Sequence, residues 1–93
     1  MLIFEVKTLD GSHSDEIKQV RAALSQLLYY EEFATNQFIN THKNKIAVFD
    51  SKITDCHIQF LNKYGIYVMW LDNTDSLTGN DDVTALINSF IIC

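Results

Sequence analysis

The stretch from Lys45 to Ser51 reads KIAVFDS, and its pattern decides how the rest of the chain can be arranged. Its four apolar residues, Ile46 to Phe49, are consecutive, so a strand built from them carries apolar side chains on both of its faces. A strand of this kind is covered on both sides, and in parallel sheets helices provide the cover. We therefore predict a central strand over residues 45–51, lying between two helical layers.

The segment on the amino-terminal side of this strand predicts one further strand and a long helix. Residues 1–8 alternate between two sets, with Leu2, Phe4 and Val6 on one face of a strand and Ile3, Glu5 and Lys7 on the other. From Asp15 to about Phe38, apolar residues recur at helical spacing. Either Ser12, in capping-box spacing with Asp15, or Ser14 is expected to cap this helix.

The segment on the carboxy-terminal side continues the alternation of helices and strands. Its predicted elements are a helix over Thr54–Lys63, a strand over Ile66–Leu71, a loop over Asp72–Asp82 and a last helix that begins at Asp81 or Asp82. Gly65 is expected to end the first of these helices in a left-handed conformation. Three strands that alternate with three helices favour an α/β fold with a parallel sheet and right-handed crossovers.

The composition limits the class of protein. The chain has 93 residues of 10.7 kDa, of which 47% are hydrophobic, and this suits one globular domain over residues 1–93. It shows neither a run of about eighteen apolar residues nor a secretion signal, so we expect a cytoplasmic protein without a membrane partner. Its net charge of −5 excludes a protein whose whole surface attracts nucleic acid. Cys56 and Cys93 are predicted to be packed, structural thiols and His57 a surface residue.

Two pairs of residues could carry chemistry. Glu5 and Lys7 stand two apart on the predicted first strand, so their side chains project from one face and can converge. Such a carboxylate can hold a divalent metal ion, and a neighbouring lysine can orient or deprotonate a metal-bound water that attacks phosphorus. Gln26 and Tyr30 stand four apart and share one side of the following helix. The Glu-x-Lys spacing is also common in pairs of solvated side chains.

The predicted first strand carries Phe4-Glu5-Val6-Lys7-Thr8, and the helix that follows carries Arg21-Ala22-Ala23-Leu24-Ser25-Gln26-Leu27-Leu28-Tyr29-Tyr30. Together these segments resemble the PD-(D/E)xK nuclease superfamily. They are similar to the E-x-K strand of that superfamily and to the Q-x-x-x-Y helix of its RecB-like branch, in the same order. Residues 46–51 and 65–71 look like the later strands of the family, so the resemblance covers most of the chain.

The resemblance implies a restriction-endonuclease-like core that hydrolyses phosphodiester bonds of DNA with Mg²⁺. By position, it implies Glu5 as metal ligand and catalytic residue, and Lys7 as the catalytic lysine. It implies Gln26 and Tyr30 as groups that steady the metal site or the nucleic-acid strand, and Arg21 as a phosphate contact. The first metal-binding aspartate of the family lies on a hairpin before the E-x-K strand, and this chain begins four residues ahead of Glu5. We therefore expect a core that lacks its first hairpin and binds Mg²⁺ weakly.

The sequence is compatible with three functions. The chain is part of a metal-dependent nuclease that binds DNA once an upstream segment or another polypeptide completes it, or it is an inactive nuclease-like scaffold that serves as a protein-interaction module. The third is a small-ligand domain of flavodoxin-like shape, although Gly11 stands alone where such folds have a glycine-rich phosphate loop. A first strand with unpaired backbone N–H and C=O groups can pair with a strand of another chain. We therefore expect a homo-oligomer or a complex with a partner polypeptide.

Overall fold

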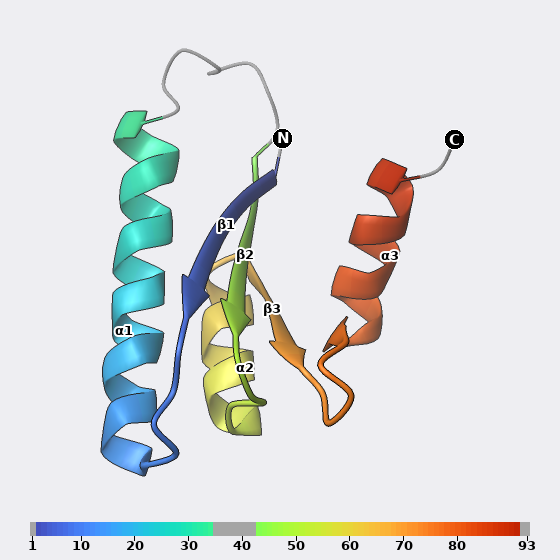
Figure 1. The fold of residues 1–93 in the computed structure, drawn as a ribbon. Helices are drawn as coiled ribbons and strands as arrows, with labels where there is room; N and C mark the ends of the chain where they lie inside the picture. Colours follow the sequence, from blue (N-terminus) through green and yellow to red (C-terminus); the bar gives the residue numbers. More distant parts are fainter. Residues whose placement is uncertain (1, 35–42, 92–93) are drawn as a thin grey trace.

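The computed structural model describes residues 2–34 and 43–91 and shows a small α/β domain with a four-stranded mixed sheet (Figure 1). Its elements are β1 (Leu2–Lys7), α1 (His13–Tyr29), the π-helical segment η1 (Tyr30–Ala34), β2 (Asn44–Phe49), α2 (Asp55–Lys63), β3 (Ile66–Leu71), β4 (Leu77–Gly79) and α3 (Asp81–Ile91). The sheet order is β1-β2-β3-β4; the first three strands are parallel, and β4 is antiparallel to β3. The predicted α/β class is confirmed.

Helices cover both faces of the sheet, as the pattern of the central strand predicts. The helices α1 and α2 lie on one face and α3 lies on the other (Figure 1). All six residues of β2 are buried, and the exposed fractions of Ile46 and Phe49, which point to opposite faces, are both 0%. The flavodoxin-like shape of the third hypothesis is wrong, because that fold places its first strand inside the sheet, whereas β1 lies at the edge of the sheet formed by the described residues.

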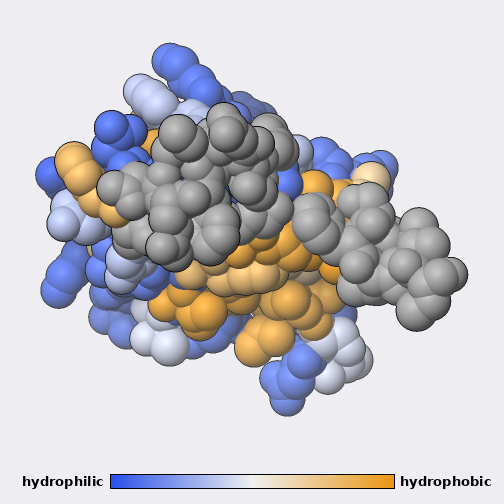
Figure 2. Space-filling model, turned by 90° about the horizontal axis from the view of Figure 1, so that it is seen from above, coloured by the Kyte–Doolittle hydropathy of each residue, from blue (hydrophilic) through white to orange (hydrophobic). Residues whose placement is uncertain are grey.

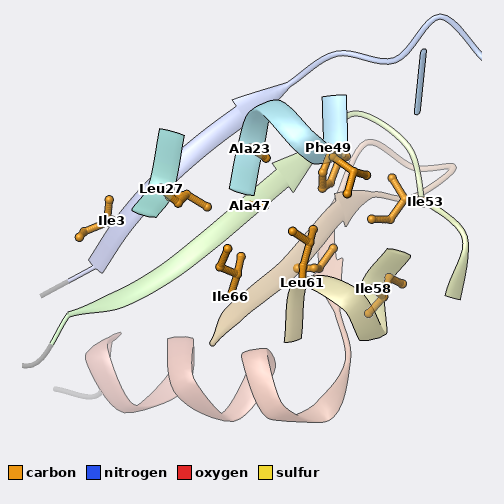
Figure 3. Close-up of a cluster of buried hydrophobic side chains, with 11 residues drawn as sticks. Ile3, Ala23, Leu27, Ala47, Phe49, Ile53, Ile58, Leu61 and Ile66 are labelled. Atoms are coloured by element: carbon orange, nitrogen blue, oxygen red, sulfur yellow. The ribbon is translucent and has the colours of Figure 1, made fainter. Parts of the chain in front are cut away.

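Each face of the sheet holds its own hydrophobic core. The larger core lies beneath α1 and α2 (Figure 3) and contains Ile3, Val20, Ala23, Leu27, Ala47, Phe49, Ile53, Ile58, Leu61, Ile66 and Val68. The smaller core beneath α3 contains Ile46, Val48, Met69 and Val83, with Leu2, Tyr67, Leu86 and Ile87 packed against it. Full burial of one such aliphatic side chain contributes about 1.5–3 kcal/mol. The layer of α1 and α2 therefore supplies most of the apolar burial.

Three predicted helix boundaries are confirmed. Ser12 caps α1, because its side-chain oxygen accepts a hydrogen bond of 3.2 Å from the backbone N–H of Asp15. Gly65 follows α2 with a φ of 77°, a left-handed conformation that favours glycine, and its N–H donates to the carbonyl of Asn62 at 3.0 Å. The last helix, α3, begins at Asp81, one of the two predicted positions.

The polar stretch over residues 72–82 is not only a loop, because it contains the short strand β4. Three residues are too few to show an alternating pattern of apolar and polar residues. The prediction for this stretch therefore followed its polar composition, which is typical of a loop. The turn before β4 is closed by Asp72, whose side-chain carboxylate accepts hydrogen bonds from the backbone N–H groups of Thr74 and Ser76 at 2.8 and 3.0 Å.

The bounds of the long helix and the central strand also differ from the predictions. The helix α1 begins at His13, two residues early, and changes at Tyr30 into η1. Wider π-helical spacing is not detected by a search at 3.6 residues per turn. Residues 35–38 of the predicted helix lie outside the described residues. The strand β2 begins one residue earlier and ends two residues earlier than the predicted range 45–51.

The junction of β4 and α3 predicts a strong effect of one added methyl group. A Cβ atom at Gly79 would lie 2.2 Å from Val83 Cγ1 and 3.0 Å from the backbone oxygen of Val68. Gly79→Ala should therefore lower the free energy of unfolding by about 1–3 kcal/mol, measured by urea denaturation. Because Val83→Ala removes the closest contact, the cost of Gly79→Ala should be smaller in that background; an equal cost in both would contradict the assigned packing.

Candidate functional site

Glu5 and Lys7 lie on the face of β1 that packs beneath α1. Ile3, two residues before Glu5 on the same face, is buried in one core with Ala23 and Leu27 of α1. Lys7 Nζ lies 3.3 Å from Glu5 Oε1, so the two side chains form an ion pair. Only 16% of the Lys7 side chain and 17% of the Glu5 side chain are exposed. Their predicted convergence is confirmed, and their chemical role remains a prediction.

The opposite face of β1 carries apolar side chains that remain exposed. Phe4 is 46% exposed and Val6 is 66% exposed, while Leu2 packs against the smaller core. Charges thus lie beneath a helix and apolar groups lie at the surface, the reverse of the usual distribution. Removing an ion pair from water costs about as much free energy as its attraction returns, so stability alone does not account for its position. This reversal makes β1 the strongest candidate for a functional site.

The helix α1 carries the second predicted pair, Gln26 and Tyr30. The Oε1 atom of Gln26 is buried and has no hydrogen-bond partner among the described residues, so it does not bind the Lys7 ammonium. Tyr30 is 39% exposed at the junction of α1 and η1, where its N–H donates to the carbonyls of Gln26 and Leu27. The structure thus joins Gln26 and Tyr30 through their backbones.

Arg21 stands apart from this pair, although it lies on the same helix. Its side chain is exposed. Arg21 precedes Gln26 by five residues, which corresponds to about 140° around an α-helix. The two side chains therefore leave different sides of α1. A phosphate contact through Arg21 remains a prediction, and it concerns a different side of the helix.

The acidic residues near β1 do not by themselves make a metal centre. Glu5 supplies one carboxylate, and the described part of the chain holds no group of three or more His, Cys, Asp or Glu side chains that could bind an ion. Magnesium takes octahedral oxygen coordination and is bound through carboxylates together with substrate phosphates and waters. Glu5 alone is therefore a poor fit to a firmly held Mg²⁺, and the site needs a further oxygen ligand.

A second polar cluster lies at the carboxyl ends of β1 and β2, where α1 and α2 begin. The carboxylate of Glu16 accepts hydrogen bonds from the N–H of Thr54 at 3.1 Å and from its hydroxyl at 2.8 Å. The same carboxylate contacts Nδ1 of His57, whose ring stacks on that of His13 with the centroids 6.2 Å apart. This cluster ties the start of α1 to the start of α2.

A surface depression of about 270 Å³ adjoins the cluster. It is lined by Leu9, Gly11, Ser12, His13, Glu16, Ser51, Lys52 and Thr54, which come from the two loops and the helix starts. Ligands of open α/β sheets bind at this edge, but here the carboxylates hold the loops together. Asp50 accepts from the N–H of Leu9 at 3.0 Å, and Asp10 accepts from the N–H of Ser12 at 2.8 Å. These bonds give the loop carboxylates a structural role.

Two predictions about this cluster are wrong. His57 is not a surface residue but is partly buried between α1 and α2, and Cys56 is exposed rather than packed. Cys93 lies outside the described residues. No sequence motif connects His57 with Glu16, because the two residues are 41 positions apart. The predicted parallel order of the strands is the feature of the sequence that could have indicated this contact. In a parallel sheet, the helices that follow successive strands begin at the same edge of the sheet.

The environment of Glu16 shifts its acidity. Burial raises the pKa of its carboxyl, whereas hydrogen bonds from His57 and Thr54 lower it, and the lowering effects together prevail, so the pKa lies below its ordinary value of 4.5. Because the pKa is depressed in the folded state, the ionised carboxylate stabilises the fold above its unfolded pKa. This contribution is lost as the pH falls through the folded pKa.

Comparison of the chain with protein-family models, with curated proteins and with solved structures gives no match. Among residues 2–34 and 43–91, no helix combines the length and apolar character that a membrane span requires.

Because the pKa of Glu16 is depressed, the free energy of unfolding should fall on acidification, and it should fall less in the variant Glu16→Gln. The wild-type free energy of unfolding should exceed that of Glu16→Gln near pH 5, and the difference should shrink between about pH 5 and pH 3 as the folded carboxylate takes up its proton. Urea denaturation at several pH values measures it. Glu32→Gln is the control, since Glu32 is exposed and makes none of these bonds. A difference that grows on acidification would contradict the prediction.

Proposed function

We propose that the chain is the carboxy-terminal part of a PD-(D/E)xK-like nuclease core, which hydrolyses phosphodiester bonds of DNA with a divalent metal ion once another segment completes its site. The observation that carries this proposal is the Glu5–Lys7 ion pair of 3.3 Å, which is largely buried beneath α1 on an edge strand. Such a pair offers an oxygen ligand for a cation beside a positive charge that attracts a phosphate. The small stabilising value of this pair supports a role other than stability for its two charges.

Four of the five predicted site residues have a role in this proposal. Glu5 would be one ligand of the cation, and Lys7 would hold its ammonium charge at the phosphate to be cleaved. The buried Oε1 of Gln26, which lacks a partner among the described residues, is an acceptor that a water molecule or the nucleic-acid strand would satisfy. Tyr30 would present an exposed ring one turn further along the helix.

The proposal requires a further acidic ligand from outside the described residues. Mg²⁺ binding through one carboxylate is weak, and a second carboxylate placed beside the open edge of β1 would lie close to Glu5. The net charge of −5 opposes general attraction to DNA, so DNA binding also depends on the completing segment. The completing segment would therefore provide both a ligand and part of the DNA contact.

A second function, an inactive nuclease-like scaffold that binds other proteins, is favoured by one specific observation. Phe4 and Val6 expose apolar surface on a strand that already has one open edge. Exposed apolar groups next to unpaired backbone are typical of surfaces that bind another chain. Under this alternative, Glu5 and Lys7 would contribute to recognition of the partner and not to hydrolysis.

Binding of Mn²⁺, followed by nuclear magnetic resonance, tests the assignment of Glu5. Mn²⁺ takes the same oxygen ligands as Mg²⁺ and broadens nearby resonances. We expect the amide signals of residues 4–7 to broaden at lower Mn²⁺ concentrations than those of the acidic turn at Asp72, and Glu5→Gln to abolish this preference. Glu32→Gln, at an exposed glutamate, is the matched control. Broadening that Glu5→Gln leaves unchanged would show that Glu5 is not a ligand.

Cleavage of labelled DNA tests the proposed reaction. The purified chain with millimolar Mg²⁺ should show no measurable cleavage, because one carboxylate holds the cation weakly. A longer polypeptide or complex that contains the chain and supplies a second carboxylate should cut DNA, and Glu5→Gln or Lys7→Ala should reduce its rate by about 100-fold or more. Lys52→Ala, which removes the exposed Lys52–Asp55 pair and the contact of the Lys52 ammonium with the Trp70 ring, should leave the rate unchanged. A completed protein that cuts equally well without Glu5 or Lys7 would refute the proposal.

A further inference from the structure

The outer edge of β1 carries unpaired backbone groups in a defined alternation. The N–H of Asp50 donates to the carbonyl of Lys7 at 3.3 Å, so the backbone of Lys7 is turned toward β2. Successive residues of a strand direct these groups to opposite edges. Phe4 and Val6 therefore direct their N–H and C=O groups away from β2, where no strand among the described residues pairs with them.

The same two residues expose their side chains on the face of the sheet that α3 only partly covers. Val83 of α3 packs on β2 and β3, against Ile46, Val48 and Met69. This helix leaves Phe4 46% and Val6 66% exposed. Figure 2, which views the molecule from above, shows a hydrophobic area in the middle of this side and smaller hydrophobic patches toward its edges. The open edge and the exposed apolar face thus belong to one strand.

We propose that this surface binds a second copy of the chain, with the two β1 strands paired antiparallel about a two-fold axis at Val6. The two sheets then form one continuous sheet of eight strands, because each copy contributes four. The axis stands perpendicular to the sheet, so the α1 helices of both copies lie on the same side. The pairing satisfies the outward N–H and C=O groups of Phe4 and Val6 and covers their apolar side chains.

Charge complementarity selects a second copy and fixes the register. With Val6 opposite Val6, Glu5 of each copy stands opposite Lys7 of the other. These are non-hydrogen-bonded positions, at which opposing Cα atoms are about 4.5 Å apart and side chains interact most closely. A register centred on Glu5 would place two carboxylates opposite each other, which is unfavourable. The sequence Glu5-Val6-Lys7 is therefore complementary to itself in one register.

Charge variants test both the partner and the register by sedimentation velocity. The wild-type chain should form a dimer at about 0.1 mM. Glu5→Lys and Lys7→Glu should each weaken self-association by roughly tenfold or more, because like charges then face each other. A mixture of these two variants should form a heterodimer, and the double variant E5K/K7E should dimerise like the wild type, since both arrangements restore opposite charges.

Circular dichroism of every variant shows whether loss of association reflects loss of folding. A wild-type monomer at this concentration would overturn the proposal, as would a mixture or a double variant that remains monomeric although folded. Capture of a different polypeptide in preference to a second copy would also overturn it. None of these outcomes depends on DNA cleavage, so failure here is distinguishable from failure of the proposed function.

Disulfide formation provides a measurement that leaves the charges intact. In a Cys56→Ser, Cys93→Ser background, Val6→Cys should cross-link two copies on mild oxidation, because Cα atoms at a hydrogen-bonded pair are about 5.5 Å apart and a disulfide spans this distance. Thr8→Cys is the control, since the two Thr8 residues would be four positions out of register, about 13 Å apart. Efficient cross-linking through Thr8 but not through Val6 would exclude the proposed register.

Discussion

Burial of β2 on both faces is the constraint on which the rest of the structure depends. Ile46 and Phe49 point in opposite directions and both are fully buried, so neither face of the sheet can remain open at this strand. Right-handed crossovers in the order β1, β2, β3 place α1 and α2 on the same face. Among the helices that the structure describes, α3, which follows β4, is the one that covers the other face. One helix cannot cover three strands, and the uncovered strand is β1.

The position of β1 explains why both proposals concern the same strand. A strand at the edge of a sheet and beyond the reach of α3 has unpaired backbone groups on one side and an uncovered face. The Glu5–Lys7 pair beneath α1 adds two charges that contribute little to stability. Both proposals use the side chains of Glu5 and Lys7 beneath the helix. Self-association uses in addition the outer backbone and the apolar face of this strand.

The sequence predicted those features that depend on local patterns. The apolar run at Ile46 to Phe49, the cap at Ser12 and the left-handed Gly65 each follow from a few adjacent residues, and the alternation in β1 correctly placed Glu5 with Lys7. The features that it did not predict are long-range or very short. The bridge from Glu16 to His57 joins residues 41 positions apart, and β4 contains three residues. The exposure of Phe4 and Val6 on β1 depends on the position of α3, and no local sequence pattern predicts that position.

The bridge from Glu16 to Thr54 and His57 has a consequence for how the domain opens. It fastens α1 to α2 at their starts, and both helices share the larger core, so these two helices and the first three strands should unfold as one cooperative unit. The smaller core joins α3 to the sheet through Val83 and the half-buried Leu86 and Ile87. Detachment of α3 alone would leave the larger core intact while uncovering Ile46, Val48 and Met69. The amides of α3 should therefore exchange with solvent through a low-energy partial opening, and those of α1 only through global unfolding.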